Sequence, residues 1–190
     1  MSSDAVKRTR RYDPGRKDRI LEAALEVIAD HGVAGTTHRS IAARADVPLG
    51  SLTYHFTSLE DLRAQAFHRH AERMSVLYAA HFDAVASPEQ LIQAVTDLIH
   101  GDAAADVRDW AVAYELYLAA LRDPDLRVVT ETWMSASRAV LERFVDPTTA
   151  RGLDALIEGL VMHKSLSTSP LPREEILSIV HRALTGLSKS

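Results

Sequence analysis

The stretch Thr36–Phe56, TTHRSIAARADVPLGSLTYHF, contains two short helical patterns separated by one break. We expect the hydroxyl of Thr36 or Thr37 to cap the N-terminus of the first helix. The small apolar face of this helix is formed by Ile41, Ala42 and Ala45. Pro48 ends the helix, because proline lacks an amide proton and disfavours the α conformation at the residue before it.

The second pattern begins at Leu49 and places Leu52 and Phe56 on one face, four residues apart. Its other faces carry Ser51, Thr53, Tyr54 and His55. A short helix, a tight turn and a second helix with polar side chains are typical of a helix-turn-helix, whose second helix enters the major groove of DNA. The same spacing also occurs in all-α proteins that never bind DNA, so a purely structural motif remains an alternative.

The longer segment Ile20–Leu62, ILEAALEVIADHGVAGTTHRSIAARADVPLGSLTYHFTSLEDL, resembles the N-terminal domain of the TetR family of bacterial transcriptional regulators. The shared residues are Ala23, Ala24, Gly32, Thr36, Thr37, Ile41, Ala42, Ala45, Val47, Gly50, Leu52, Tyr54, His55, Phe56 and Leu62. The resemblance implies a three-helix DNA-binding domain followed by a larger helical body that binds an effector and forms a dimer. The rest of the chain shows only the all-helical character of the family.

Helix caps, prolines and glycines predict an all-α fold of about nine helices. Asp13-Pro14 opens the first helix and Gly32 ends it, while Ser58 caps a long helix that reaches about Asp83. Further helices are expected at about 88–100, 103–122, 124–146, 147–166 and 173–187. We expect a basic flexible arm at 1–15, a DNA-binding domain at 16–57 and an effector-binding and dimerisation domain at 58–190.

Charge is distributed unevenly along the chain of 190 residues, whose formal net charge is −4. Residues 1–57 hold 9 Lys and Arg against 7 Asp and Glu, and the remainder holds 13 against 19. This asymmetry fits a cationic DNA-binding end. The arm contains Lys7, Arg8, Arg10 and Arg11, which either contact DNA or are simply solvated.

Composition excludes several classes of protein. No run of about 18 apolar residues exists, which predicts no membrane span, and no apolar segment follows the basic N-terminus as in a signal peptide. We therefore expect a cytoplasmic protein. The sequence lacks cysteine, so it forms no disulfide or thiolate metal site. No nucleophile–base arrangement, phosphate loop or metal-ligand cluster is evident, so we expect no enzyme activity, cofactor or metal.

The resemblance assigns DNA-binding roles to individual residues. Thr37 would hold a phosphate, Arg39 would reach a phosphate or a guanine edge, and Tyr54 and His55 would donate to phosphates. The groove would be faced by Leu49, Gly50, Ser51 and Thr53. The chain departs from the family where Asp46 replaces a frequent glycine, Thr53 a frequent tyrosine and Leu59 a usual lysine, so one phosphate contact is missing.

Aromatic residues recur at helical spacing in the body, where they either form the core or line a ligand pocket. The resemblance implies a pocket for a small effector, which we expect to be apolar or aromatic. Its candidate residues are Met74, Tyr78, Trp110, Tyr114, Tyr117 and Trp133, with Glu115 and His163 as polar groups.

The last two predicted helices are more apolar than one neighbouring helix can cover. The resemblance implies that they pair with their copies in a homodimer, through Leu153, Leu156, Leu160, Ile176, Val180 and Leu184. Such a dimer matches a palindromic operator in double-stranded DNA. The alternative is that both helices are buried within the monomer.

The sequence thus predicts a ligand-responsive, homodimeric transcriptional regulator, most simply a repressor that an effector releases from DNA. A regulator switched by a protein partner is one alternative. The other is an all-α small-molecule binding protein or enzyme whose helix-turn-helix is purely structural.

Overall fold

The computed structural model describes residues 13–101 and 105–187, and these residues form nine α-helices without any strand. The helices are α1 Arg16–Gly35, α2 His38–Arg44, α3 Gly50–His55, α4 Leu59–His81, α5 Pro88–His100, α6 Val107–Ala120, α7 Pro124–Leu141, α8 Pro147–Leu166 and α9 Arg173–Leu187. The predicted all-α fold is therefore confirmed. Within the described ranges, no helix is long and apolar enough to cross a lipid bilayer.

Three helices begin at a proline, as the sequence predicts. Proline occupies the first turn of α5, α7 and α8, and the preceding Ser87, Asp123 and Asp146 each accept a hydrogen bond from a backbone amide of that turn. Proline fits there because an amide in the first turn has no acceptor inside the helix, so the lack of an N–H removes no helical hydrogen bond. These caps fix the start of each helix in the body.

Several helix ends differ from the prediction, and α1 continues past the predicted end at Gly32 to Gly35. α1 begins at Arg16 rather than at Pro14, because the Asp13 side chain bonds the Gly15 amide in a turn before the helix. α6 begins at Val107, where Asp106 is the cap, and ends at Ala120. α4 ends at His81, and α7 ends at Leu141 because a turn follows it.

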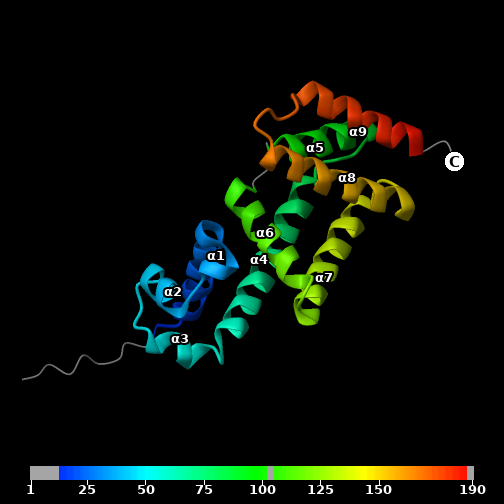
Figure 1. Cartoon of the computed structure of the whole chain (residues 1–190). Helices are drawn as coiled ribbons and strands as arrows, with labels where there is room; N and C mark the ends of the chain where they lie inside the picture. Colours follow the sequence, from blue (N-terminus) through cyan, green and yellow to red (C-terminus); the bar gives the residue numbers. More distant parts are fainter. Residues whose placement is uncertain (1–12, 102–104, 188–190) are drawn as a thin grey trace, which may run out of the picture.

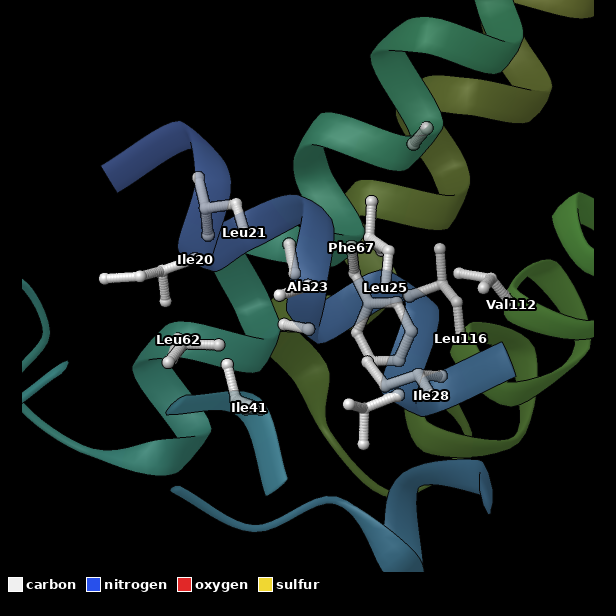
Figure 2. Packing of buried hydrophobic residues seen from close by; sticks show 14 of the residues in the cluster. Ile20, Leu21, Ala23, Leu25, Ile28, Ile41, Leu62, Phe67, Val112 and Leu116 are labelled. Atoms are coloured by element: carbon white, nitrogen blue, oxygen red, sulfur yellow. The ribbon is translucent and has the colours of Figure 1, made fainter. Parts of the chain in front are cut away.

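The buried side chains form two clusters. The head core joins α1, α2, α3 and the first half of α4 to α6 and the start of α7. Figure 2 shows its centre, where Phe67 of α4 lies among side chains of α1 and α6 such as Ile28 and Leu116. The DNA-binding helices therefore share one core with part of the body.

The distal core joins α5, α8 and α9 to the ends of α4 and α7. In Figure 1, α1–α3 lie at one end of the molecule, α4 runs from them into the body, and α5, α8 and α9 lie at the opposite end. Trp110 of α6 packs against both cores. The region around Trp110 is consequently the junction between the two halves of the protein.

Candidate nucleic-acid interface and effector pocket

The helix-turn-helix is held by a capping box and a buried apolar face. Thr37 is the N-cap of α2: its hydroxyl accepts from the Ser40 amide at 3.1 Å, and the Ser40 hydroxyl accepts from the Thr37 amide at 2.9 Å. Ile41 and Leu52 are fully buried between the helices. The capping box fixes the start of α2, and the shared buried face holds α3 against α2.

The turn between α2 and α3 contains a left-handed residue. Asp46 has a φ of 51°, a conformation that aspartate adopts at some cost and glycine adopts freely. The next amide, that of Val47, donates to the Ala42 carbonyl at 3.1 Å. The structure thus explains how aspartate stands where the family often has glycine.

The candidate DNA-contacting residues lie on the exposed side of this scaffold. Tyr54 is 79% exposed and Leu49 is 49% exposed. The exposed set also includes Thr37, Arg39, Gly50 and Thr53, whereas Ser51 and His55 are half-buried. The Tyr54 ring meets the His55 ring edge-on at 5.0 Å. A Cβ at Gly50 would meet no atom within 4 Å, so nothing in the subunit itself requires glycine there.

Two basic residues brace the motif and were missed by sequence reasoning. Arg63 of α4 donates to the Thr36 carbonyl at 2.7 Å, and the Lys17 ammonium lies 5.7 Å from the Phe56 ring centroid. Leu59 packs against the head core, which explains why an apolar residue replaces the usual lysine at this position. The signal for Arg63 and Lys17 is weak, because basic residues on helices are usually solvated.

Four predicted pocket residues, Met74, Tyr78, Trp110 and Trp133, line one cavity of about 40 Å³ in the body. The cavity lies at the junction of the head and distal cores. Its remaining lining residues come from α4, α5, α7, α8 and the segment before α6: Leu77, Leu98, Ala105, Ser137, Asp154, Ile157 and Glu158.

Two further predicted residues form a second layer behind this lining. The Tyr117 ring lies 5.7 Å from Trp133, and its hydroxyl donates to Glu158 at 2.8 Å. Tyr114 stacks on Trp110 with ring centroids 6.3 Å apart. The aromatic residues of α6 therefore support the cavity from one side.

Glu115 and His163 were predicted for the pocket but do not line this cavity. The Glu115 carboxylate accepts from the Val33 amide of α1 at 2.8 Å, so this residue joins α6 to the head instead of facing the cavity. His163 is exposed and lines a separate surface groove between α8 and the segment before α9. Helical spacing did not reveal which face of α6 and α8 each residue occupies.

Asp154 and Glu158, one turn apart on α8, are pocket residues that the prediction missed. Burial raises the pKa of both carboxyl groups. Arg138 lies 3.6 Å from Asp154, and Tyr117 bonds Glu158. Their i, i+4 spacing beside Ile157 on α8 was the available signal, because acidic residues are rarely buried unless they have a partner.

A network of ion pairs connects α6 to the DNA-binding helices. Arg108 of α6 and Arg44 of α2 lie 2.7 Å and 2.8 Å from the Asp30 carboxylate of α1. The two guanidinium groups lower the pKa of Asp30 to about 2. Arg44 also pairs with Glu26 at 2.9 Å. The start of α6 is thus tied to both α1 and α2.

The six predicted dimer residues differ in how far they are exposed on the single subunit. Leu153, Ile176, Val180 and Leu184 are buried in the distal core of their own subunit, where α8 and α9 pack on α5. Leu156 and Leu160 are half-buried at the edge of this core, and the exposed side of α8 carries Gly152, Ala155, Met162 and Leu166.

Lys7, Arg8, Arg10 and Arg11 of the predicted arm lie outside the described residues.

Comparison with known families gives two separate matches along the chain. Residues 20–66 match the family described as bacterial regulatory proteins, tetR family, and residues 86–186 match the tetracyclin repressor-like C-terminal domain. The second match alone covers more than half of the chain. The protein belongs to the TetR family.

Three related proteins illustrate how similar the chain is to known regulators and to a drug-binding protein. A proposed transcriptional regulator from Streptomyces coelicolor A3(2) is 44% identical, with a TM-score of 0.82 over 90% of this chain and 99% of that one. The multidrug binding protein EbrR, complexed with ethidium, is 39% identical, with a TM-score of 0.71 over 90% and 99% of the two chains. The regulator BetI of Escherichia coli K12 is 26% identical over 186 residues, which cover 90% and 92%.

TetR-family proteins are transcriptional regulators that bind DNA and small-molecule effectors, and they are generally not enzymes. The chain is accordingly a transcriptional regulator with an N-terminal helix-turn-helix and a C-terminal ligand-binding domain.

Proposed function

We propose that this TetR regulator is a homodimeric repressor that binds a palindromic operator and is released by a small apolar or aromatic effector. One observation carries the ligand response: α6 both lines the cavity, through Trp110, and holds α1, through Glu115 and Arg108. A displacement of α6 by a ligand would therefore act directly on the DNA-binding helices.

The exposed face of α3 would enter the major groove. Leu49, Gly50 and Thr53 would face the bases, and the exposed Tyr54 hydroxyl would donate to a phosphate. Thr37 and Arg39 would contact the backbone beside them, where Arg39 also reaches a guanine edge. The capping box and the buried apolar face support this role, because a fixed α3 binds DNA without a cost of ordering.

The cavity is far smaller than a small-molecule site, which usually measures about 300–1,000 Å³. An effector must therefore separate the helices around it before it can bind. The conformer described here has a closed cavity, and we assign it to the DNA-binding state. An effector that favours a second, open conformer lowers operator affinity by its differential binding to the two states.

The relative EbrR supports an aromatic effector. Its structures hold ethidium, proflavin and malachite green, each of which contains several aromatic rings. The cavity here presents two tryptophans, a tyrosine and a methionine. We infer that a multi-ring aromatic molecule is the effector of this chain as well.

The dimer would form through the exposed side of α8. Gly152, Ala155 and Gly159 are small residues that allow a second helix to approach closely, and a Cβ at Gly159 would meet no atom of its own subunit. Leu156 and Leu160 would complete this surface from the edge of the distal core. A two-fold dimer would place two α3 helices about 34–36 Å apart, one turn of DNA.

Selection of random duplex DNA by the purified protein tests the proposal. We expect the retained sequences to share a palindrome with half-sites one helical turn apart. Absence of any enrichment at low salt, both before and after unfolding and refolding to remove a bound effector, would exclude operator binding. Enrichment of a single half-site would exclude the dimer.

A further inference from the structure

The cavity combines aromatic rings with two carboxylates. Trp110, Trp133 and Tyr78 supply the rings, and Asp154 and Glu158 supply the carboxylates from successive turns of α8. A ring face attracts a cation through its quadrupole, and a carboxylate attracts it through its charge. Both kinds of group therefore favour the same type of ligand.

Only one of the two carboxylates has a basic residue nearby to neutralise its charge. Asp154 has the Arg138 guanidinium at 3.6 Å, whereas the Tyr117 hydroxyl donates to Glu158 at 2.8 Å. Along the described parts of the chain, Glu158 has no lysine, arginine or histidine within ion-pair distance. The cavity consequently carries one unbalanced negative charge when both acids are ionised, and such a buried charge is unfavourable without a partner.

The protonation of Glu158 reflects this environment. Burial raises the pKa of Glu158, the hydrogen bond from Tyr117 lowers it, and the nearby Asp154 raises it. The other groups that face this part of the cavity are Arg138, which pairs with Asp154, and Tyr78, whose buried hydroxyl lacks a hydrogen-bond partner. A bound cation would stabilise the ionised Glu158, and a polar ligand atom would satisfy Tyr78.

We propose that the effector is an aromatic cation whose charge is neutralised by Glu158 and whose rings lie against Trp110 and Trp133. The inference deepens the proposed function, on which it rests for the role of the cavity as the effector site. The simpler explanation to exclude is that Glu158 serves only to position Tyr117.

Binding is best measured on the full chain without DNA, because aromatic cations intercalate into duplexes. Proflavin and acridine are matched probes at pH 8: both are planar three-ring molecules, but proflavin is a cation there and acridine is neutral. We expect fluorescence titration to give one proflavin per subunit, bound at least about tenfold more tightly than acridine. Equal affinity for the two probes would overturn the proposal.

Three variants locate the charge. Glu158→Gln keeps an oxygen for the Tyr117 hydroxyl but removes the charge, so we expect it to weaken proflavin about tenfold or more and to leave acridine unchanged. Glu131→Gln makes the same change on the exposed side of α7 and should leave both affinities unchanged. Tyr117→Phe removes the hydrogen bond but keeps the charge and should retain proflavin binding. Undiminished proflavin binding by Glu158→Gln, or an equal loss in Tyr117→Phe, would overturn the proposal.

A separate measurement distinguishes the cationic effector from the proposed repressor function on which it rests. Tetraphenylphosphonium is an aromatic cation that does not intercalate, so its effect on operator binding can be read directly. Release of the selected operator by a neutral aromatic molecule, but not by tetraphenylphosphonium, would leave the ligand-responsive repressor intact and refute the cationic effector. Failure of the DNA selection, combined with Glu158-dependent proflavin binding, would refute the repressor and retain the cation site.

Discussion

Single buried residues determine how this protein responds to acid. His70 of α4 is fully buried, its ring meets Trp133 edge-on at 6.0 Å, and its Nε2 atom has no hydrogen-bond partner. Burial lowers the pKa of His70 to about 4, although the Asp109 carboxylate opposes this shift and the Arg73 charge adds to it. The imidazole is therefore neutral in the folded protein at neutral pH.

The folded protein should lose stability between pH 6.5 and pH 4. The pKa of His70 is lower in the folded state than its usual 6.5, so within this window the unfolded chain binds more protons. The difference corresponds to about 3 kcal/mol of unfolding free energy, lost as the pH falls. Urea unfolding at several pH values measures it.

Two histidine variants separate this effect from general acid denaturation. His70→Gln should show a flatter decline of stability across the window, whatever its stability at pH 7. His68→Gln changes an exposed histidine two residues away and should decline as the wild type does. Equal declines in the wild type and His70→Gln would contradict the assignment.

Tyr54 should contribute to DNA affinity without contributing to the fold. Its side chain is 79% exposed, so Tyr54→Ala should leave the melting temperature unchanged and weaken operator binding about tenfold, the usual size of one lost contact. Because the phenol is uncharged, the salt dependence of binding should keep its slope. Tyr54→Phe should lose as much if the hydroxyl makes the contact, and unchanged affinity in both variants would exclude Tyr54 from the interface.

At the scale of elements, the contact between α1 and α6 joins the DNA-binding helices to the body. Gly32 has a φ of 67° inside α1, and the chain continues to Gly35 beyond this kink. The kink exposes the Val33 amide to Glu115, and a Cβ at Gly32 would lie 2.9 Å from the Glu115 Oε1 atom. Glycine is thus required by the backbone, and a Cβ there would also displace the end of the Glu115 side chain.

Gly32→Ala should therefore destabilise the protein by about 1–3 kcal/mol, since alanine is strained at positive φ. Thermal unfolding should show a fall of several degrees in melting temperature. Gly50→Ala is the matched control, because a Cβ there meets no neighbour within 4 Å and should not change the melting temperature. Equal melting temperatures for Gly32→Ala and the wild type would refute the requirement.

The sequence predicts elements better than it predicts their faces. Caps at Ser58, Ser87 and Asp146 act over three or four residues, so local sequence was sufficient to locate those helices. The direction of Glu115 depends on how α6 packs against α1, 82 residues away from its partner Val33, and no local pattern encodes that. Asp154 and Glu158 were missed although their spacing beside Ile157 gave a local signal.

At the scale of the whole molecule, the outer face of α8 is the surface through which we propose that two subunits associate. Gly159→Arg should give a monomer with an intact fold, because a Cβ there meets no atom of its own subunit and the longer side chain would enter the partner. Thr132→Arg, on an exposed position of α7, should remain dimeric. Sedimentation measures the mass and circular dichroism the fold.

The monomeric variant should also bind the operator much more weakly, since each subunit would then bind only one half-site. A Gly159→Arg protein that remains a dimer would exclude this face of α8 from the interface. An unfolded variant would indicate instead that Gly159 packs inside the subunit, contrary to the open space around it.

The small volume of the cavity sets a lower limit on the size of a molecule that can act as a signal. A space of about 40 Å³ admits something as small as a few water molecules without moving its walls. Ammonium or a similarly compact ion could thus enter the cavity without changing the distance between the two DNA-binding domains of the dimer. Only a molecule large enough to separate the head core from the distal core would change that distance and release the operator. The regulator would in this way ignore the abundant small cations of its surroundings and react to bulky ones alone.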